Sequence, residues 1–567
     1  MIKLTIKYTL LTPFLILSLA AFGQDKKDPK VPPPATTPQK TQEPQKSNIK
    51  EEIEVVRPYK PILAEAVKLR RSPTLDDNKP FKPQLTYNIT GKKLELNADI
   101  AQLKAQKLAA EQADTLTNNY LKIGAGNFNT GVGEIYISNG KDQALQVGMF
   151  IKHVSQSGSL DKQSYSDQQG SVFGKSILDK FALSGKFTYD RKSTFLYGFN
   201  PLLPPNPSAL PPSKQRYNIF DLEGELVKNT TEDTSQFNYA FKLNGYLFNN
   251  YYRAREKSAV LSGYVNKAFN KFNFGLATSV DLTGTKDSLN LSNNIFRVNP
   301  YAKFKGNGFV LNLGLNLVQE FGTASRLNLL PAVTVEIPIA PEYAILFGGI
   351  SGDVSKTNLR DLSTENPYLN DRLIVKNAIE KINFYGGVKG NAGSGLGFKA
   401  TASYKTIDNL PLFVNNSKYV NRFDLIYDGG SSHILGLDGE LNLRASDVLT
   451  LTGKVQFANY NLATEREAWF KPALKLSSNV NAQITKKILL NAEILYSGDS
   501  YAKSPTQQSE TIVVNGFADL STGVEYRFNK KIGLYVNANN IFAKSYQQYL
   551  YYPKLGFNVF GGFNFSF

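Results

Sequence analysis

Apolar and polar side chains alternate residue by residue over long stretches of this chain. In FVLNLGLNLVQ (309–319), Phe309 and the leucines at every second position after it would share one face of a strand, opposite two asparagines and a glycine. The same alternation recurs at 488–497, 520–528, 532–539 and 557–567. A period of two is that of a β-strand. These segments run about 10–13 residues, the length at which a tilted strand crosses a bilayer, whereas globular strands average about five or six residues.

Connections of two kinds separate these segments. Long polar loops, such as 199–215, 355–373 and 497–511, recur at one end of the strands. Short turns recur at the other end, at 139–142, 268–272, 305–308, 340–343, 392–395, 445–448, 485–487 and 529–531, and near Asp179 and Glu232. Short turns on one rim and long loops on the other are typical of membrane barrels, and about ten short turns correspond to about 22 strands. The sequence therefore predicts an all-β fold, a transmembrane antiparallel β-barrel of about 22 strands.

The last segment, LGFNVFGGFNFSF (555–567), places five apolar side chains on one face, at Phe557, Val559, Phe563, Phe565 and Phe567. In water these rings would be exposed, but in lipid they form the favourable face. We expect this strand to pair with the first strand near 119–128, because an unpaired edge is costly in hydrocarbon. Phe563, Phe565 and Phe567 are predicted to be the barrel-closing and assembly signal.

The N-terminal part of the chain has a different composition. Lys3 and Lys7 precede an apolar run that is shorter than a spanning helix, which predicts a cleaved secretory signal peptide over 1–23; the alternative is an uncleaved anchor. Residues 24–47 are rich in proline and poor in apolar residues, as in a disordered tether. Residues 48–117 are predicted to form a short periplasmic or plug-like segment with a helix at 97–114, ahead of a barrel over 118–567.

The end of the chain resembles a known family. The stretch VNANNIFAKSYQQYLYYPKLGFNVFGGFNFSF (536–567) is similar to the last two strands of TonB-dependent outer-membrane receptors. The matching positions are an Asn-Leu-Phe-like step, a tyrosine, a Pro-Gly turn and a terminal aromatic, found here as Asn540, Ile541 and Phe542, then Tyr546, then Pro553 with Gly556, then Phe567. The arginine usual after that glycine is replaced by Phe557. The stretch 118–140 resembles the first hairpin of plug-poor relatives of the Bacteroidetes type.

This resemblance implies a barrel in the outer membrane of a Gram-negative cell that takes up a solute. Its implied partners are outer-membrane lipid and lipopolysaccharide, the barrel-assembly machinery, and a TonB-type energy-coupling protein or other envelope proteins. The family carries a globular plug, whereas only about 70 residues stand between tether and barrel here, near the lower limit for an independent domain. A segment of six residues is a candidate energy-coupling box or strand-adding segment, and a plain linker strand is its alternative: Glu51, Glu52, Ile53, Glu54, Val55 and Val56. Two other functions remain open, a scaffold barrel that does not transport and a passive porin.

Candidate catalytic and metal-binding residues are scarce. The chain has two histidines, His153 and His433, which lie in unrelated hairpins, and it has no cysteine. This set does not provide a nucleophile with its base or a zinc site, so we expect no enzymatic activity, no metal and no cofactor. The formal net charge of +17 is consistent with basic rims that attract anionic solutes or lipid headgroups. A native role in nucleic-acid binding is not expected in the outer membrane.

Overall fold

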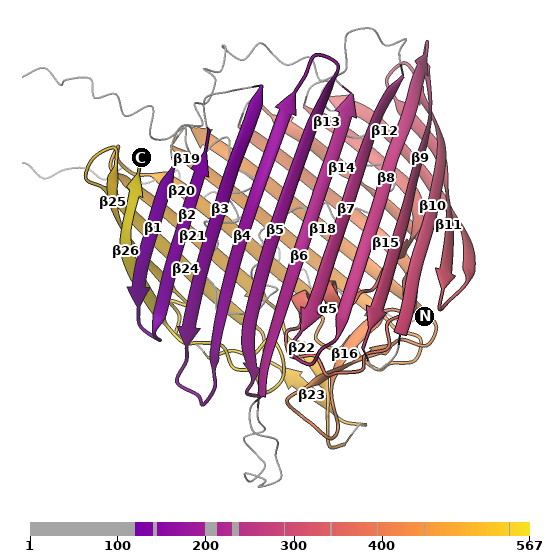
Figure 1. Cartoon of the computed structure of the whole chain (residues 1–567). Helices are drawn as coiled ribbons and strands as arrows, with labels where there is room; N and C mark the ends of the chain where they lie inside the picture. The colour runs from indigo at the N-terminus through magenta and orange to yellow at the C-terminus, as the bar shows by residue number, and fades with distance from the viewer. Residues whose placement is uncertain are drawn as a thin grey trace, which may run out of the picture. The chain divides into compact units, whose positions relative to one another are not determined.

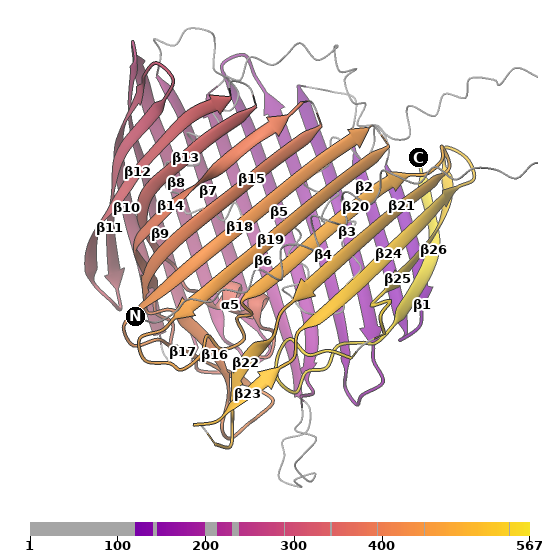
Figure 2. The same ribbon diagram turned by 180° about the vertical axis from the view of Figure 1, so that it is seen from behind.

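A closed antiparallel barrel of 22 strands makes up most of the structure (Figures 1 and 2). The computed structural model describes residues 119–139, 144–198, 213–228, 237–287, 290–340, 343–393, 395–446, 448–507, 509–543 and 545–567. Each barrel strand pairs with the next one along the chain, and β1 pairs with β26 from Tyr120 opposite Ser566 to Gly126 opposite Phe560. The predicted all-β barrel of about 22 strands and its closure between the first and last strands are confirmed.

The barrel strands are 7–16 residues long, a wider spread than the sequence predicted. They are β1 (Tyr120–Gly126), β2 (Thr130–Ser138), β3 (Leu145–Ser157), β4 (Ser164–Ile177), β5 (Phe181–Leu196), β6 (Ser213–Lys228), β7 (Asn238–Asn250), β8 (Arg255–Phe269), β9 (Phe272–Lys286), β10 (Asn290–Lys305), β11 (Val310–Gly322), β12 (Arg326–Ala340), β13 (Ala344–Ser355), β14 (Ala378–Ala392), β15 (Leu396–Asp408), β18 (Ser431–Ser446), β19 (Leu449–Asn461), β20 (Leu474–Gln483), β21 (Ile488–Ser497), β24 (Phe517–Arg527), β25 (Ile532–Asn539) and β26 (Asn558–Ser566). Among the described residues, one helix and two strand pairs lie outside the barrel wall: helix α5 (Leu359–Glu365), the pair β16 (Pro411–Asn415) and β17 (Phe423–Tyr427), and the pair β22 (Ser500–Lys503) and β23 (Thr511–Val514).

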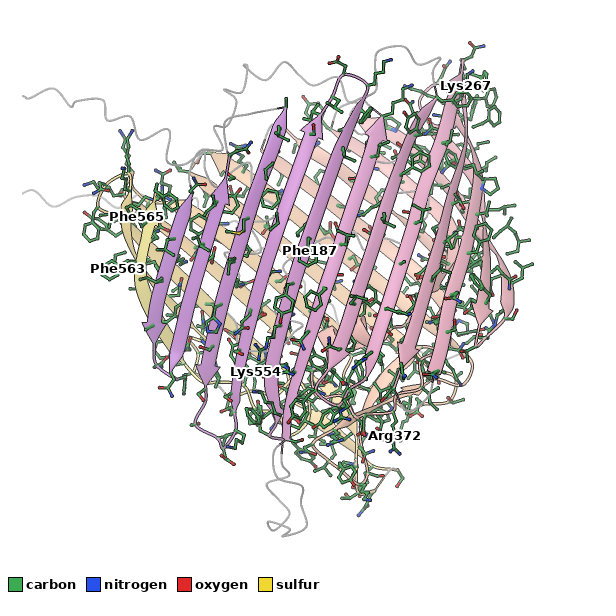
Figure 3. All side chains as sticks on the ribbon, in the orientation of Figure 1. Phe187, Lys267, Arg372, Lys554, Phe563 and Phe565 are labelled. Atoms are coloured by element: carbon green, nitrogen blue, oxygen red, sulfur yellow. The ribbon has the colours of Figure 1, made fainter. Side chains whose placement is uncertain are left out.

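The period of two separates the two faces of the wall. On β11, Leu313, Leu315 and Leu317 are exposed, whereas Asn312 and Asn316 are buried inside. On β26, Phe563 and Phe565 are exposed, as is Phe567 directly after the strand, and Figure 3 shows Phe563 and Phe565 projecting outward from the wall. The outer face is therefore apolar and the inner face polar, as the sequence predicts. Among the described residues no helix is long and apolar enough to cross a membrane.

The connections divide between two rims. The turn rim, uppermost in Figure 1, carries ten connections of two to nine residues, and they coincide with the ten predicted turns. The loop rim carries the predicted long loops and also four tight connections of three or four residues, at 127–129, 251–254, 287–289 and 323–325. The expectation that every connection at this end is long was wrong, because neighbouring strands there extend far enough to be joined directly. The long loops instead gather over one part of the mouth.

Residues 1–118 lie outside the described part of the chain. The signal peptide, the tether, the plug-like segment and the candidate box from Glu51 to Val56 all fall there and stay predictions.

Candidate functional site: a cap of loops on the barrel mouth

Four connections at the loop rim meet in one cluster of buried apolar side chains. Their described residues, 197–198, 356–377, 409–430, 540–543 and 545–557, contribute to it together with the end of β5. The cluster consists of Leu196, Tyr197, Leu362, Tyr368, Leu369, Phe413, Phe423, Tyr549 and Tyr552. We call these packed residues the cap. Figures 1 and 2 show α5, part of the cap, lying within the outline of the barrel near the loop rim in both views. The cap therefore folds over the mouth of the lumen.

Tyrosines hold the cap together through both their rings and their hydroxyl groups. The rings of Tyr368 and Tyr552 stack with centroids 3.5 Å apart, and Tyr197 meets Tyr552 edge-on at 4.9 Å. Tyrosine hydroxyls also donate hydrogen bonds from one connection to another. Tyr552 donates to the Asn421 carbonyl at 2.6 Å, and Tyr549 donates to the Glu365 carbonyl at 2.7 Å. A buried tyrosine needs such a partner for its hydroxyl. Each of these residues thus joins one loop to another.

A carboxylate on the inner wall anchors α5. Glu256 of β8 is buried and accepts hydrogen bonds from the backbone N–H groups of Leu359 at 3.0 Å and Arg360 at 3.2 Å. Thr285 and Tyr246 also donate to this carboxylate, at 2.8 and 2.9 Å. The first N–H groups of a helix lack partners within the helix, and a negative charge there is favourable. Glu256 therefore fixes the start of α5 to the wall.

Ion pairs fix the same connection at two further points. The Arg360 guanidinium lies 2.9 Å from the Asp221 carboxylate of β6 and stacks over the Tyr246 ring at 4.0 Å. Lys356 pairs with Asp281 of β9 and donates to the Thr283 hydroxyl at 2.6 Å. Burial lowers the pKa of the Lys356 ammonium, and Asp281 offsets only part of this effect. In the closed mouth these contacts take the place of water around the charged side chains. The same side chains would be hydrated when the cap is released.

Asp428 joins the 409–430 connection to the 462–473 connection. Its carboxylate accepts hydrogen bonds from the backbone N–H groups of Ala463 and Thr464, both at 2.7 Å, and of Glu465 at 3.0 Å. The hydroxyls of Ser432 and Thr464 also donate to it, at 2.6 and 2.7 Å. Burial raises its pKa, but these donors outweigh burial and hold the pKa of Asp428 well below its usual range.

A small cavity remains within the cap. It measures about 10 Å³ and is lined by Gln163, Ser164, Tyr165, Thr194, Tyr197, Tyr368, Tyr552, Lys554 and Leu555. The Thr194 hydroxyl is buried and has no hydrogen-bond partner among the described residues. This volume suits one water molecule, so the cap is closely packed.

The family-like motif of the last two strands lies mainly in the 540–557 connection. Asn540 has a left-handed backbone, with φ of 47°, and its side-chain amide donates to the Leu555 carbonyl at 3.0 Å. Tyr546 donates to Asp519 at 2.6 Å and stacks on Phe517 at 3.9 Å. The Pro553 carbonyl accepts from Gln163 and from Tyr197.

The other motif positions differ in exposure. Ile541 donates through its backbone N–H to Leu520, Phe542 is exposed, and Gly556 precedes the exposed Phe557. The motif thus packs the last connection against the wall, where Tyr549 and Tyr552 contact the other residues of the cap. The assembly role predicted for Phe563, Phe565 and Phe567 stays a prediction.

The two histidines lie on the outer faces of β3 and β18, near the loop-rim ends of these strands. His433 contacts the hydroxyls of Tyr404 at 3.1 Å and Thr406 at 3.2 Å. Within the described ranges no three His, Asp or Glu side chains converge as a metal site would require.

Sequence reasoning did not identify the residues of the cap. Glu256 and Asp281 were available as a signal, since each is an acidic residue at an inward position near a strand end. The run YQQYLYYP (546–553) was a second signal, because four tyrosines in a loop are more than solvent exposure requires.

Comparison with known proteins supports the fold. No family model matches the chain, and no curated protein sequence matches it. Among solved structures, the FrpB iron transporter from Neisseria meningitidis (F5-1 variant) aligns with a TM-score of 0.60 and 11% identity, over 79% of this chain and 82% of that one. The pyoverdine outer-membrane receptor FpvA from Pseudomonas aeruginosa aligns with a TM-score of 0.60 and 11% identity, over 80% and 79%. The ferric-catecholate import receptor Fiu from E. coli K12 aligns with a TM-score of 0.59 and 10% identity, over 80% and 82%. The chain therefore shares the barrel fold of these receptors.

Proposed function

We propose that the protein is an outer-membrane barrel that moves a solute across the membrane through a gated lumen. The observation that carries the proposal is the cap, because it closes the mouth with connections that are fastened to the wall by ion pairs and hydrogen bonds. The shared fold with the FrpB, FpvA and Fiu receptors supports transport as the role of such a barrel. The loop rim then faces the outside of the cell and the turn rim faces the periplasm, as in other outer-membrane barrels.

The apolar outer wall supports the membrane location. Large apolar side chains are exposed at alternate positions of nearly every strand, for example Leu243, Leu261 and Leu282 on three adjacent strands. So large an apolar surface in water would be a strong aggregation liability, whereas in lipid it is the favourable state.

Gating fits the chemistry of the contacts that fasten the cap. A buried ion pair gains little net free energy, because its attraction mainly offsets the cost of taking two charges out of water. Lys356 with Asp281 and Arg360 with Asp221 therefore hold a closed position without making release prohibitively costly. An aqueous solute that supplies hydration or competing charge at the mouth would shift the cap toward an open position.

Two other functions make different predictions. A passive porin needs an open mouth, and the cap counts against it. A scaffold barrel that does not transport is favoured by the β22–β23 pair, whose Tyr501 and Val513 are exposed while Ala502 and Val514 pack on the cap. Such a hairpin offers a surface to another envelope protein.

Single-channel conductance in planar bilayers separates these functions. We would compare the mature chain, a Lys356→Met/Arg360→Met variant, a chain lacking residues 48–117, and a chain with both changes. A gated transporter should conduct little in its native form and most when both changes are combined. The matched control is Lys381→Met, which removes an ion pair with Asp408 from the outer wall and should leave conductance unchanged.

The remaining outcomes contradict the proposal. Free conductance of the unmodified chain would indicate a porin. No increase in the combined variant would indicate a sealed scaffold, and the partner would then be sought by co-purification from native membranes. Deletion of 48–117 without any effect would rule out a plug role for that segment.

A further inference from the structure

A row of basic and amide side chains crosses the outer wall of five adjacent strands, β5–β9, beside the loop rim. The residues are direct cross-strand neighbours, in the order Arg191, Asn218, Asn249, Arg255 and Lys286. Asn218 donates to Asn249 at 2.9 Å and accepts from Tyr189 at 3.2 Å. We call this set the basic row.

Strand alternation places the basic row on the outer face. On β8, Arg255 and Lys257 are exposed, and they alternate with the buried inward residues Glu256 and Ser258. They share the face of Leu261, which is 56% exposed. On β5, Arg191 lies four residues from Phe187, which projects from the middle of the wall in Figure 3.

Within the described part of the chain, the positive charges of the row have no acidic partner. Arg255 lies directly opposite Lys286 in the sheet, and among the described residues neither forms an ion pair, as is also true of Arg191. Asp287, which follows Lys286 in sequence, accepts from the backbone N–H of Arg372 at 2.8 Å. Like charges directly opposite each other destabilise a sheet, so an anion between these residues would relieve the repulsion.

Further basic residues flank the row, and apolar side chains lie below it. Arg216 and Lys214 follow on the rim side of β6, and Lys257 is the next outward residue of β8. The adjacent outward positions toward the middle of the wall are Tyr189, Phe220 and Leu247, and then Phe187 and Leu222. The surface is therefore amphiphilic along the strand direction, with positive charge at the rim and an apolar strip beneath.

On β8 the depth of the row matches that of lipid headgroups. Strand β8 has 15 residues centred on Ser262; with a rise of about 3.3 Å per residue and a tilt of about 40°, Lys257 lies about 13 Å and Arg255 about 18 Å from the middle of the strand along the barrel axis. The apolar band of such barrels is about 25 Å tall. Lys257 thus lies at its edge and Arg255 beyond it.

We propose that the basic row binds the phosphate groups of a phosphorylated lipid in the outer leaflet, whose acyl chains lie along the apolar strip below. Arginine suits this role because its planar guanidinium can donate two hydrogen bonds to one phosphate, and Asn218 and Asn249 add amide groups between the two arginines. The inference rests on the membrane location within the proposed function and not on transport.

The opposite rim provides a matched control. Lys267 is on the same strand and the same outer face, and Figure 3 shows it at the turn rim. Its ammonium lies over the rings of Phe237 at 4.8 Å and Phe269 at 5.2 Å, so its charge is already engaged by aromatic rings. Replacing Lys267 and Lys271 removes as many charges as replacing Arg255 and Lys286.

The test measures lipid binding by the detergent-purified full chain with native mass spectrometry. The probes are diphosphorylated lipid A and the same lipid after removal of both phosphates. The native chain should bind the phosphorylated form about tenfold more tightly. Arg255→Gln/Lys286→Gln should bring the two affinities to within about twofold, and Lys267→Gln/Lys271→Gln should keep the tenfold preference.

Three results would overturn the proposal. They are equal binding of the two lipids by the native chain, an unchanged preference in Arg255→Gln/Lys286→Gln, and an equal loss in the turn-rim control. Thermal unfolding without lipid checks folding, and because repulsion is relieved, Arg255→Gln/Lys286→Gln should melt at or above the temperature of the native chain. A chain that does not insert into bilayers would defeat the proposed function as well, whereas insertion with indiscriminate lipid binding would defeat this proposal alone.

Discussion

Leu261→Arg tests whether the apolar outer wall faces lipid. Leu261 is the residue before Ser262, the centre of β8, and at about 3.3 Å per residue with a tilt of about 40° it lies within about 3 Å of the middle of the wall. Its cross-strand neighbours on the outer face are Leu243 and Val280. An arginine here would therefore have apolar side chains directly opposite it on both sides.

The expected cost is that of an arginine near the bilayer midplane, about 2–4 kcal/mol. Because about 1.4 kcal/mol is a factor of ten, the folding equilibrium constant should fall by about 30-fold to about 700-fold. In water the same substitution at a half-exposed position would cost almost nothing.

Denaturant unfolding in phospholipid vesicles measures this cost. The chain has one tryptophan, Trp469. It lies in the 462–473 connection, is buried against Leu410 and Leu412 of the cap, and donates to Glu465 at 2.8 Å, so its fluorescence reports the folded mouth. Tyr251→Arg, in the tight connection between β7 and β8, is the control and should cost at most about 1 kcal/mol because it lies beyond the apolar band. Equal stability of the Leu261→Arg variant and the native chain would refute a lipid-facing wall.

Three further changes probe the cap. Asp428→Asn should cost about 1–3 kcal/mol, because the amide leaves several buried donors without an acceptor. In the native chain the pKa of Asp428 is lower in the folded state than in the unfolded state, so its stabilisation is present above about pH 4 and is lost as the pH falls further. A pH series of unfolding curves measures this loss. Tyr552→Ala should increase proteolysis of the cap but leave the barrel heat-resistant on gels, since its ring and hydroxyl contacts lie within the cap. Arg360→Met should expose the α5 connection to limited proteolysis while Lys381→Met does not; equal protection in both variants would contradict the anchoring role of Arg360.

The wall could be predicted from the sequence because its physics is local. Each wall residue faces either the lumen or the outside, so Leu313 and Asn312 report their environments without reference to any distant residue. The same reasoning placed Phe563 and Phe565 outside and paired the last strand with the first. The four tight connections at the loop rim were missed because the residues of a short turn are the same kinds at either rim and do not show at which rim the turn lies.

The cap could not be predicted in this way because its contacts join residues that are far apart in the chain. Tyr197 meets Tyr552 across more than 300 residues, and Glu256 finds its partners in Leu359 and Arg360 about a hundred residues later. A buried carboxylate on a strand signals that something must satisfy it, but the sequence does not say which loop does so. The basic row is an intermediate case. The alternation of each strand predicts that its charged residues face outward, but their alignment into a row depends on the register between strands.

The distant origins of the cap also set an order of events during folding. Tyr549 and Tyr552 lie in the last connection of the described chain, just before β26, while Tyr197 follows β5. The cap therefore draws on both ends of the barrel sequence, and it is complete only when the connection between the last two strands is in place. A chain in which β26 and the connection before it have not docked would have both an unpaired strand edge and an incomplete cap. Quality control that recognises one of these defects would therefore also remove molecules with the other.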